Sequence, residues 1–215
     1  MRVVVAGGHG QIALHLERML AERGDEPVGL VRNPDHASDL EAVGARAVVL
    51  DLEKSDAAEL AALLEGADAV VFAAGAGPNS GPERKDTVDR RGAALLADAA
   101  EQAGVRRYVL VSSMGTDQVD PDSDDVMAVY LRAKAAADEN LRSRDLDWTI
   151  VKPGRLTDDK GNEQVRAGVD VGDGEIPRSD VAAVLLAVLH TPETIGRQFS
   201  LVGGPSSIED ALLSL

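Results

Sequence analysis

The chain contains no cysteine. Without cysteine a protein cannot form a disulfide, use a thiolate nucleophile or bind a metal through sulfur, so all three kinds of site are excluded. Histidine is also scarce, and neither His9 nor His15 has a partner at the spacing of a metal-binding motif. We therefore expect no metal site.

Long hydrophobic runs are missing too. No segment reaches the ~18 apolar residues that a membrane-spanning helix requires. Met1 and Arg2 lead directly into a short apolar run, without the pattern of a signal peptide. These two features predict a cytoplasmic protein with no membrane association.

Basic and aromatic residues are few. The 22 Lys and Arg residues are outnumbered by 37 Asp and Glu residues, which gives a formal net charge of −15. Nucleic acids and anionic membranes bind basic surfaces, so we expect neither as a partner. Aromatic residues make up 2% of the 215 residues, whereas hydrophobic residues make up 44%. The core is therefore aliphatic, as is typical of buried parallel strands packed against helices.

Short apolar runs recur along the chain and predict the strands of a sheet. They cover residues 3–6, 28–31, 47–50, 69–74, 108–113, 148–151 and 199–202. Between them, apolar residues recur at helical spacing, as in Ile12, Leu16, Met19 and Leu20. Such alternation indicates repeated βα units with right-handed crossovers. We predict an α/β fold: a doubly wound parallel sheet with helices on both faces, in one domain over residues 1–215.

Three polar segments interrupt this rhythm. Residues 75–87 and 114–125 follow the fourth and fifth predicted strands, and the carboxyl ends of strands are where open α/β sheets bind ligands. Residues 154–177 are predicted to be irregular and to form a small C-terminal flap on the substrate side. The alternative for all three is an ordinary surface loop.

A glycine-rich turn follows the first predicted strand. Residues 7–13 read GGHGQIA and fit both G-x-G-x-x-G/A and the offset G-x-x-G-x-x-A pattern. Glycine allows the backbone to turn tightly and approach a ligand, and the next helix presents free N–H groups to a pyrophosphate. The pattern predicts a dinucleotide site; the alternative is a tight turn without a ligand. The contact residues expected here are Gly7, Gly8, His9, Gly10, Gln11 and Ile12.

The ends of the next three predicted strands complete this expected site. The second strand leads to Arg32, where NAD-preferring proteins usually carry an acid, and a guanidinium can pair with a 2′-phosphate. We therefore expect NADP(H) as the preferred cofactor, with NAD(H) as the alternative. Asp51 and Leu52 are expected beside the adenine. The small residues Ala73, Ala74 and Gly75 leave room beneath the cofactor.

A tyrosine and a lysine lie four residues apart at Tyr130 and Lys134. On a helix this spacing places both side chains on one face. A nearby ammonium favours the phenolate, so the pair can move a proton at a substrate oxygen. Ser112 and Ser113 end the fifth strand and can offer a hydroxyl to the same oxygen. Tyr108 lies inside that strand and is expected to pack in the core.

Together these motifs resemble the short-chain dehydrogenases/reductases, and in particular their atypical, NAD(P)H-binding, epimerase-like group. The resemblance covers essentially the whole chain. It rests on GGHGQIA, VDRRGAALLADAAEQAGVRRYVLVSSMG, YLRAKAAADENL and WTIVKPGRLTD.

The resemblance implies a Rossmann-like fold and assigns roles to several residues. Ser113 would polarise the substrate oxygen, Tyr130 would be the acid/base, and Lys134 would tune Tyr130 and hold the nicotinamide ribose. Pro153 and Gly154 would border the nicotinamide. Asp89 stands where extended members of the family often carry Asn, so the resemblance leaves the role of this position open.

These observations favour an NADP(H)-dependent oxidoreductase that acts on a small carbonyl or alcohol. Two alternatives remain. One is a non-catalytic dinucleotide-binding regulator or redox sensor, which would have no need for a tuned tyrosine. The other is a sugar-nucleotide epimerase or dehydratase. The sequence predicts a small-molecule substrate without identifying it, and it indicates no oligomeric state.

Overall fold

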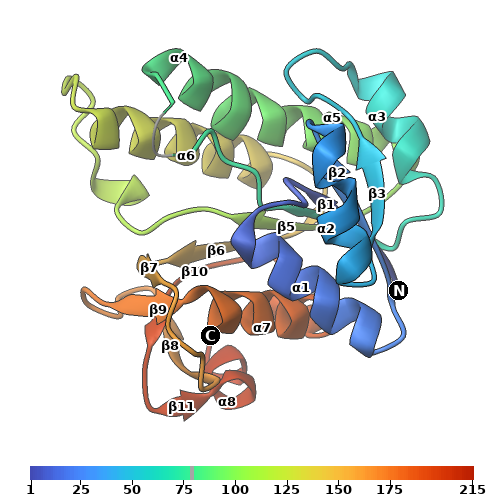
Figure 1. The fold of residues 1–215 in the computed structure, drawn as a ribbon. Coiled ribbons are helices and arrows are strands. Elements are labelled where there is room, and N and C mark those ends of the chain that lie inside the picture. The colour runs from blue at the N-terminus through green and yellow to red at the C-terminus, as the bar shows by residue number, and fades with distance from the viewer. Residues whose placement is uncertain (78–79) are drawn as a thin grey trace.

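A nine-stranded sheet forms the middle layer of the molecule, and helices cover both of its faces (Figure 1). The computed structural model describes residues 1–77 and 80–215. The strands of this sheet lie in the order β11-β8-β10-β6-β5-β4-β1-β2-β3. Their bounds are β1 (Arg2–Ala6), β2 (Glu26–Val31), β3 (Arg46–Val49), β4 (Ala69–Phe72), β5 (Arg107–Val111), β6 (Asp147–Pro153), β8 (Gln164–Gly168), β10 (Arg197–Gly203) and β11 (Ser206–Ser207). The predicted α/β fold is confirmed.

Seven neighbouring strands of the sheet pair in parallel, and an apolar run predicted each of them. In spatial order they are β10, β6, β5, β4, β1, β2 and β3. β1 pairs with β2 on one side and with β4 on the other. The direction of chain progression therefore reverses beside β1. In sheets of this kind, ligands bind in the crevice at the carboxyl ends of the strands next to such a reversal.

Residues 154–177 are not irregular, and that expectation was wrong. The segment contains β7 (Arg155–Thr157), β8 and β9 (Glu175–Pro177). β7 and β9 form a small parallel sheet of their own, whereas β8 joins the main sheet antiparallel to β10 and β11. An antiparallel strand needs only one buried face, and in β8 only Val165 is fully buried. The strand is also short and mostly polar, so no apolar run in the sequence predicts it.

Alternation along the strands sends side chains to two separate cores. On β1, Val4 and Ala6 pack into one core, and Val3 and Val5 pack into the other. The first core lies beneath α3 (Ala57–Leu64), α5 (Ala93–Ala103) and α6 (Val126–Arg142); the second lies beneath α1 (Gln11–Glu22), α7 (Arg178–Leu189) and α8 (Ile208–Leu213). A smaller cluster, which includes Leu40 of α2 (Ala37–Ala42), covers the β3 end of the sheet.

The polar segment 75–87 is partly helical, which the sequence did not predict. α4 (Pro82–Arg84) leads into the π-helical turn η2 (Lys85–Gly92), which continues into α5. π-helical turns are rare and occur frequently at functional sites. Single 3₁₀ turns lie at η1 (Pro34–His36), η3 (Thr116–Gln118) and η4 (Pro192–Thr194).

Within residues 1–77 and 80–215, no helix has both the length and the apolar character needed to cross a membrane.

Candidate active site

The turn between β1 and α1 brings backbone atoms into unusually close approach. Gly7 adopts a φ of +83°, and a Cβ atom at this position would lie 2.5 Å from the Cα of Ala74. A Cβ on Gly8 would lie 2.7 Å from the Cα of Gly29. The Gly10 N–H donates to the Gly7 carbonyl at 2.8 Å and closes the turn. Only glycine fits at Gly7 and Gly8, so the turn leaves backbone exposed at the start of α1.

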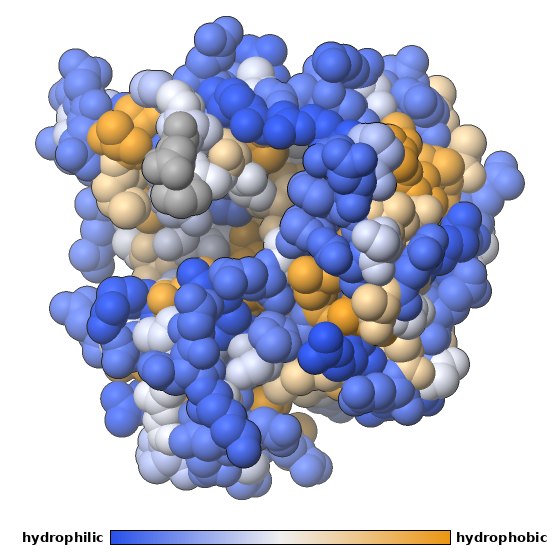
Figure 2. Space-filling model, in the orientation of Figure 1, coloured by the Kyte–Doolittle hydropathy of each residue, from blue (hydrophilic) through white to orange (hydrophobic). Residues whose placement is uncertain are grey.

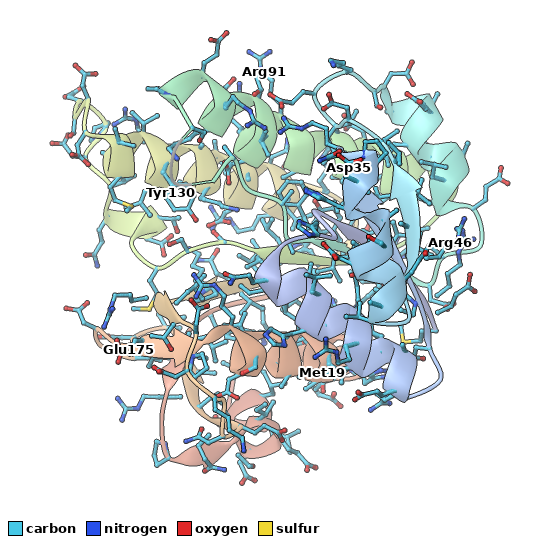
Figure 3. The ribbon with its side chains drawn as sticks, in the orientation of Figure 1. Met19, Asp35, Arg46, Arg91, Tyr130 and Glu175 are labelled. Carbon is cyan, nitrogen blue, oxygen red and sulfur yellow. The ribbon has the colours of Figure 1, made fainter. Side chains whose placement is uncertain are left out.

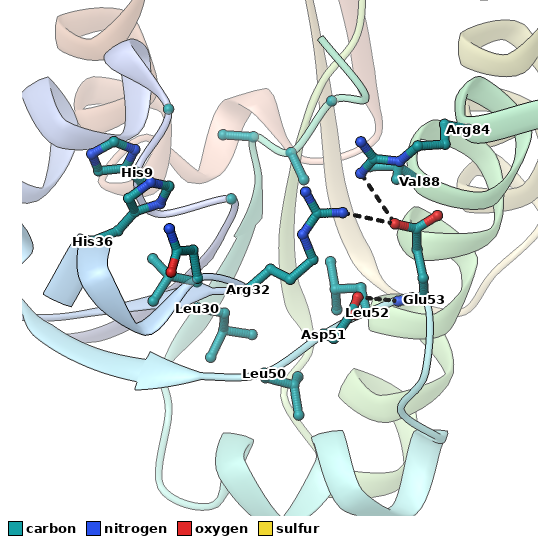
Figure 4. A pocket seen from close by; sticks show the side chains of 17 residues that line it. His9, Leu30, Arg32, His36, Leu50, Asp51, Leu52, Glu53, Arg84 and Val88 are labelled. Atoms are coloured by element: carbon teal, nitrogen blue, oxygen red, sulfur yellow. Dashed lines mark hydrogen bonds and ion pairs between the residues drawn. The ribbon is translucent and has the colours of Figure 1, made fainter. Parts of the chain in front are cut away.

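A pocket of about 290 Å³ opens beside this turn, at the carboxyl ends of β1, β2, β3 and β4 (Figure 4). The structure brings together nine of the residues predicted for cofactor binding on its wall. They are Gly7, His9, Gly10, Arg32, Asp51, Leu52, Ala73, Ala74 and Gly75. Gly8 is buried behind the turn, whereas Gln11 begins α1 and faces a different surface hollow. Ile12 packs partly against the core.

Two arginines meet over one carboxylate at the mouth of this pocket. Arg32 Nη1 lies 3.2 Å from Glu53 Oε2, and Arg84 Nη2 donates to the same oxygen at 3.1 Å. Thr87 Oγ1 donates to the other oxygen, Oε1, at 2.6 Å. The bond from Thr87, together with Arg84, holds the pKa of Glu53 below its usual value. Sequence reasoning identified Arg32 alone, because Glu53 and Arg84 come from other segments.

Two histidines border the opposite side of the pocket mouth (Figure 4). The rings of His9 and His36 stack with their centroids 3.6 Å apart and their planes inclined by 15°. His9 Nε2 lies 2.8 Å from Asp39 Oδ2. His36 was missed because nothing in its local sequence distinguishes it from a surface residue.

A second hollow lies further along the same edge of the sheet, at the ends of β5 and β6. Ser113, Pro153 and Gly154, all predicted for the reacting end of the site, line it together with Met127 of α6 and Glu175 of β9. Figure 2 shows the largely hydrophilic face of the molecule hollowed between the upper helices and the β7–β9 region. Figure 3 shows Tyr130 on α6 above this hollow and Glu175 below it.

Of the two serines that follow β5, only Ser113 lines this hollow. Its Oγ donates to the Met114 carbonyl at 3.1 Å. Ser112 is buried, with 5% of its surface exposed. Ser112, also considered from the sequence, is therefore not part of the lining of this hollow.

Tyr130 and Lys134 share a face of α6, as their spacing predicts. Lys134 Nζ lies 5.9 Å from the centroid of the Tyr130 ring. The ammonium is buried, pairs with Asp89 Oδ1 at 3.2 Å and donates to the Val111 carbonyl at 3.1 Å. The Asp89 carboxylate offsets part of the positive charge of Lys134, which the sequence analysis expected to act on Tyr130 alone. A second ammonium, Lys85 Nζ from η2, lies 5.4 Å from the same ring centroid.

Asp89, whose role the sequence left open, is fully buried in η2. Its Oδ2 accepts a hydrogen bond from the Ala76 N–H at 3.1 Å, and its Oδ1 faces Lys134. Asp89 thus ties the chain after β4, where the first pocket ends, to the helix that carries Tyr130. A neutral Asn could not form this ion pair.

A separate buried charge network lies beneath the η3 turn. Lys152 Nζ contacts Asp138 Oδ2 at 3.3 Å and Asp117 Oδ2 at 2.8 Å, and Thr116 Oγ1 donates to Asp138 at 3.2 Å. Burial raises the pKa of Asp138, and Lys152 opposes that rise. This network joins β6, η3 and α6. It fixes α6 at Asp138, on the C-terminal side of Tyr130.

A buried carboxyl lies directly behind the glycine turn. Glu17 of α1 is fully buried, and its Oε1 would lie 2.9 Å from a Cβ on Gly8 and 2.5 Å from a Cβ on Gly29. Burial raises the pKa of Glu17 to about 8. The group is therefore mainly neutral at pH 7, and it fills the space that the two glycines leave.

The first pocket suits the adenosine half of a dinucleotide. The close approach at Gly7 and Gly8 opens a cradle for phosphates at the N-terminus of α1, where free N–H groups attract anions. The two guanidiniums at the mouth suit a further anionic group. Over residues 1–77 and 80–215, no group of three or more His, Asp or Glu side chains is placed to hold a metal ion.

Comparison with known proteins agrees with this geometry. The model of a family described as NAD(P)H-binding matches residues 7–192. The "Uncharacterized sugar epimerase YhfK" of Bacillus subtilis (strain 168) is 35% identical over 216 residues, covering 100% of both chains.

Solved structures resemble the whole chain as well. A Bacillus halodurans protein named after the NAD-dependent epimerases/dehydratases has a TM-score of 0.91 at 36% identity, covering 100% of both chains. The oxidoreductase ylbE of Lactococcus lactis has a TM-score of 0.89 at 27% identity, covering 100% of this chain and 96% of that one.

Proposed function

The chain belongs to the NAD(P)H-binding family, and from this membership we propose that it is an NADP(H)-dependent oxidoreductase of the short-chain dehydrogenase/reductase type that acts on a small carbonyl or alcohol. One observation carries the proposal. The first pocket and the hollow lined by Ser113 lie along one edge of the sheet, with Tyr130 on α6 above the hollow, so a single extended cofactor can reach both.

The cofactor would be held from its adenosine end. Asp51, Leu52 and Arg32 would hold the adenine and its ribose, and the N-terminus of α1 at Gly10 would meet the pyrophosphate. Pro153 and Gly154 would border the nicotinamide. When bound, this ring would supply or accept the hydride.

The protein would supply the proton. In the direction of reduction, the Tyr130 hydroxyl would give its proton to the substrate oxygen; in oxidation it would take the proton back. Ser113 Oγ–H would donate to the same oxygen. Lys134, which its pairing with Asp89 fixes beside Tyr130, would offer an N–H to the nicotinamide ribose.

The NADP(H) preference is tested by titrating NADPH and NADH into wild type and Arg32→Ala. The loss of a guanidinium–phosphate contact is worth roughly 1.5–3 kcal/mol, or about ten- to hundredfold in affinity. We expect NADPH to bind the variant more weakly by this factor, with NADH unchanged. Equal affinities of wild type for the two cofactors would refute the preference.

A sugar-nucleotide epimerase or dehydratase is the second candidate. The names of the relatives from Bacillus subtilis and Bacillus halodurans favour it. The two candidates differ in the size of the substrate, since an epimerase of this kind must also hold the nucleotide of a UDP-sugar. A non-catalytic regulator is the third, and it would bind the cofactor without turnover.

A further inference from the structure

The Glu53 carboxylate occupies an unusual position between two guanidiniums. A single oxygen, Oε2, faces Arg32 Nη1 at 3.2 Å and Arg84 Nη2 at 3.1 Å, while Thr87 holds the other oxygen. The three charged residues come from the end of β2, the loop after β3 and α4. Figure 4 shows them meeting at the mouth of the first pocket.

This arrangement is the one that a phosphate group would take up. Guanidiniums recognise carboxylates and phosphates through the same N–H donors, and each guanidinium has five of them. The cluster carries two positive charges and one negative charge, so it retains a net positive charge at a pocket that opens to solvent. The side chains of Arg32 and Arg84 are 55% and 39% exposed, so both remain accessible to a ligand.

We infer that Arg84 joins Arg32 in binding the 2′-phosphate of the cofactor, and that Glu53 competes with this phosphate for both guanidiniums and so limits the affinity for NADPH. The inference rests on the proposed function, because it assumes that the first pocket takes the adenosine end of NADP(H). It adds two residues that set the discrimination between NADPH and NADH.

Competition follows from the charges and from the hydrogen bond to Thr87. Glu53 and the phosphate are both anionic, so they repel one another at the same two cations. Exposed ion pairs contribute little to stability, so the bonds of Glu53 to the arginines give way easily. When they do, the bond from Thr87 to Oε1 still satisfies part of the carboxylate.

Two small probes isolate the 2′-phosphate. Adenosine 2′,5′-bisphosphate and adenosine 5′-monophosphate differ only in that group, and neither contains nicotinamide. Their dissociation constants are measured by calorimetry for wild type, Arg32→Ala, Arg84→Ala, Arg84→Lys and Glu53→Gln. Arg91→Ala is the matched control, because Arg91 is exposed in η2 and pairs with Asp86, away from the pocket wall.

We expect Arg84→Ala to bind the bisphosphate about ten- to hundredfold more weakly, as for loss of a bond to a charged group, with the monophosphate unchanged. Arg84→Lys should recover part of this loss, since it keeps the charge and loses the fork. Glu53→Gln should bind the bisphosphate roughly fivefold or more tightly, by removal of the competing charge. Arg91→Ala should behave as wild type.

Three results would overturn the inference. The first is unchanged or weaker bisphosphate binding by Glu53→Gln, and the second is unchanged bisphosphate binding by Arg84→Ala; thermal unfolding of each variant shows that it is folded. If wild type still prefers the bisphosphate over the monophosphate and Arg32→Ala loses this preference, the proposed function stands and only this inference fails. The third is a wild type that binds both probes equally, which contradicts the proposed function as well.

Discussion

Tyr130 is the residue on which the proposed chemistry depends most. It lies above the hollow that contains Ser113, with Lys134 and Lys85 against its ring. Tyr130→Phe removes the transferable proton and little else, so we expect kcat to fall by about 10²–10⁴ with NADPH affinity unchanged. The assay follows NADPH oxidation with the small aldehyde or ketone that wild type turns over fastest.

Tyr108→Phe is the matched control for this experiment. The Tyr108 hydroxyl is buried in the core and donates to the Ala93 carbonyl at 3.0 Å, so its loss should leave kcat near the wild-type value. Full activity of Tyr130→Phe would move the acid/base role to another group.

Glu17 should make the stability of the protein depend on pH. Its pKa is raised from 4.5 to about 8 by burial, so the folded state keeps a proton that the unfolded state loses above pH 4.5. Stability therefore falls as pH rises between these two values, by up to ~1.4 kcal/mol per pH unit. Glu17→Gln removes this pH dependence. The free energy of unfolding of the variant minus that of wild type should therefore increase steadily from pH 5 to pH 8.

The comparison is made by urea unfolding of both proteins at each pH, with Glu22→Gln as the control on an exposed part of the same helix. A difference between Glu17→Gln and wild type that stays constant over this range would show that Glu17 is already ionised in the folded state.

The site residues that could be predicted are those at the ends of strands. Arg32 and Asp51 each follow an apolar run directly and Ala73 lies near the end of one, and parallel strands bring such ends to one edge. Glu53 and Arg84 could not be predicted, because their meeting depends on the path of two polar loops. The pairing of Asp89 with Lys134 depends on the π-helical turn, whose register no helical periodicity reveals.

The turn between β1 and α1 is the element that holds the proposed cofactor site open. Gly7→Ala places a Cβ 2.5 Å from the backbone of Ala74 at a φ of +83°. We expect a loss of roughly 3 kcal/mol in the free energy of unfolding, together with weaker NADPH binding. Urea unfolding and calorimetry measure the two effects.

Gly104→Ala separates strain from close approach. Gly104 ends α5 with a φ of +72°, and a Cβ there would meet nothing within 4 Å. It should cost only about 1 kcal/mol and leave NADPH binding intact. Equal losses for the two variants would mean that the contact with Ala74 relaxes freely, so that the turn does not require glycine for close approach.

Elements with a strong apolar pattern were predictable, and the others were not. Strands β1, β2, β4, β5 and β6 are buried on both faces over most of their length and therefore read as unbroken apolar runs. β7, β9 and β11 have two or three residues each, which is too short for a period to emerge. β8 alternates only from Val165 to Arg166 and Ala167, within a polar sequence.

Most of the elements that follow β6 are already packed against the main sheet. α7, α8 and β10 pack into the second core, and β8 extends the main sheet. The remaining parts of 154–177 contain no aromatic residue that could stack on a base.

We therefore expect UDP-sugars not to bind, since residues 154–177 offer no aromatic side chain that could stack on a second base. Calorimetry of UDP-glucose against the NADPH-loaded protein tests this directly, with the apo protein as the control for binding in the cofactor pocket. Micromolar binding to the loaded protein would favour the epimerase over the oxidoreductase.

The most direct test of the proposed function is to let NADPH and NADH compete for binding to the protein. The purified protein, freed of bound nucleotide, is mixed with equal amounts of NADPH and NADH, and the complexes are weighed by native mass spectrometry. The pocket with Arg32 at its mouth predicts that the NADPH complex predominates by at least about tenfold, and that the Arg32→Ala protein loses this excess. Equal complexes in wild type, or an excess of the NADH complex, would contradict the assignment of an NADP(H)-dependent oxidoreductase.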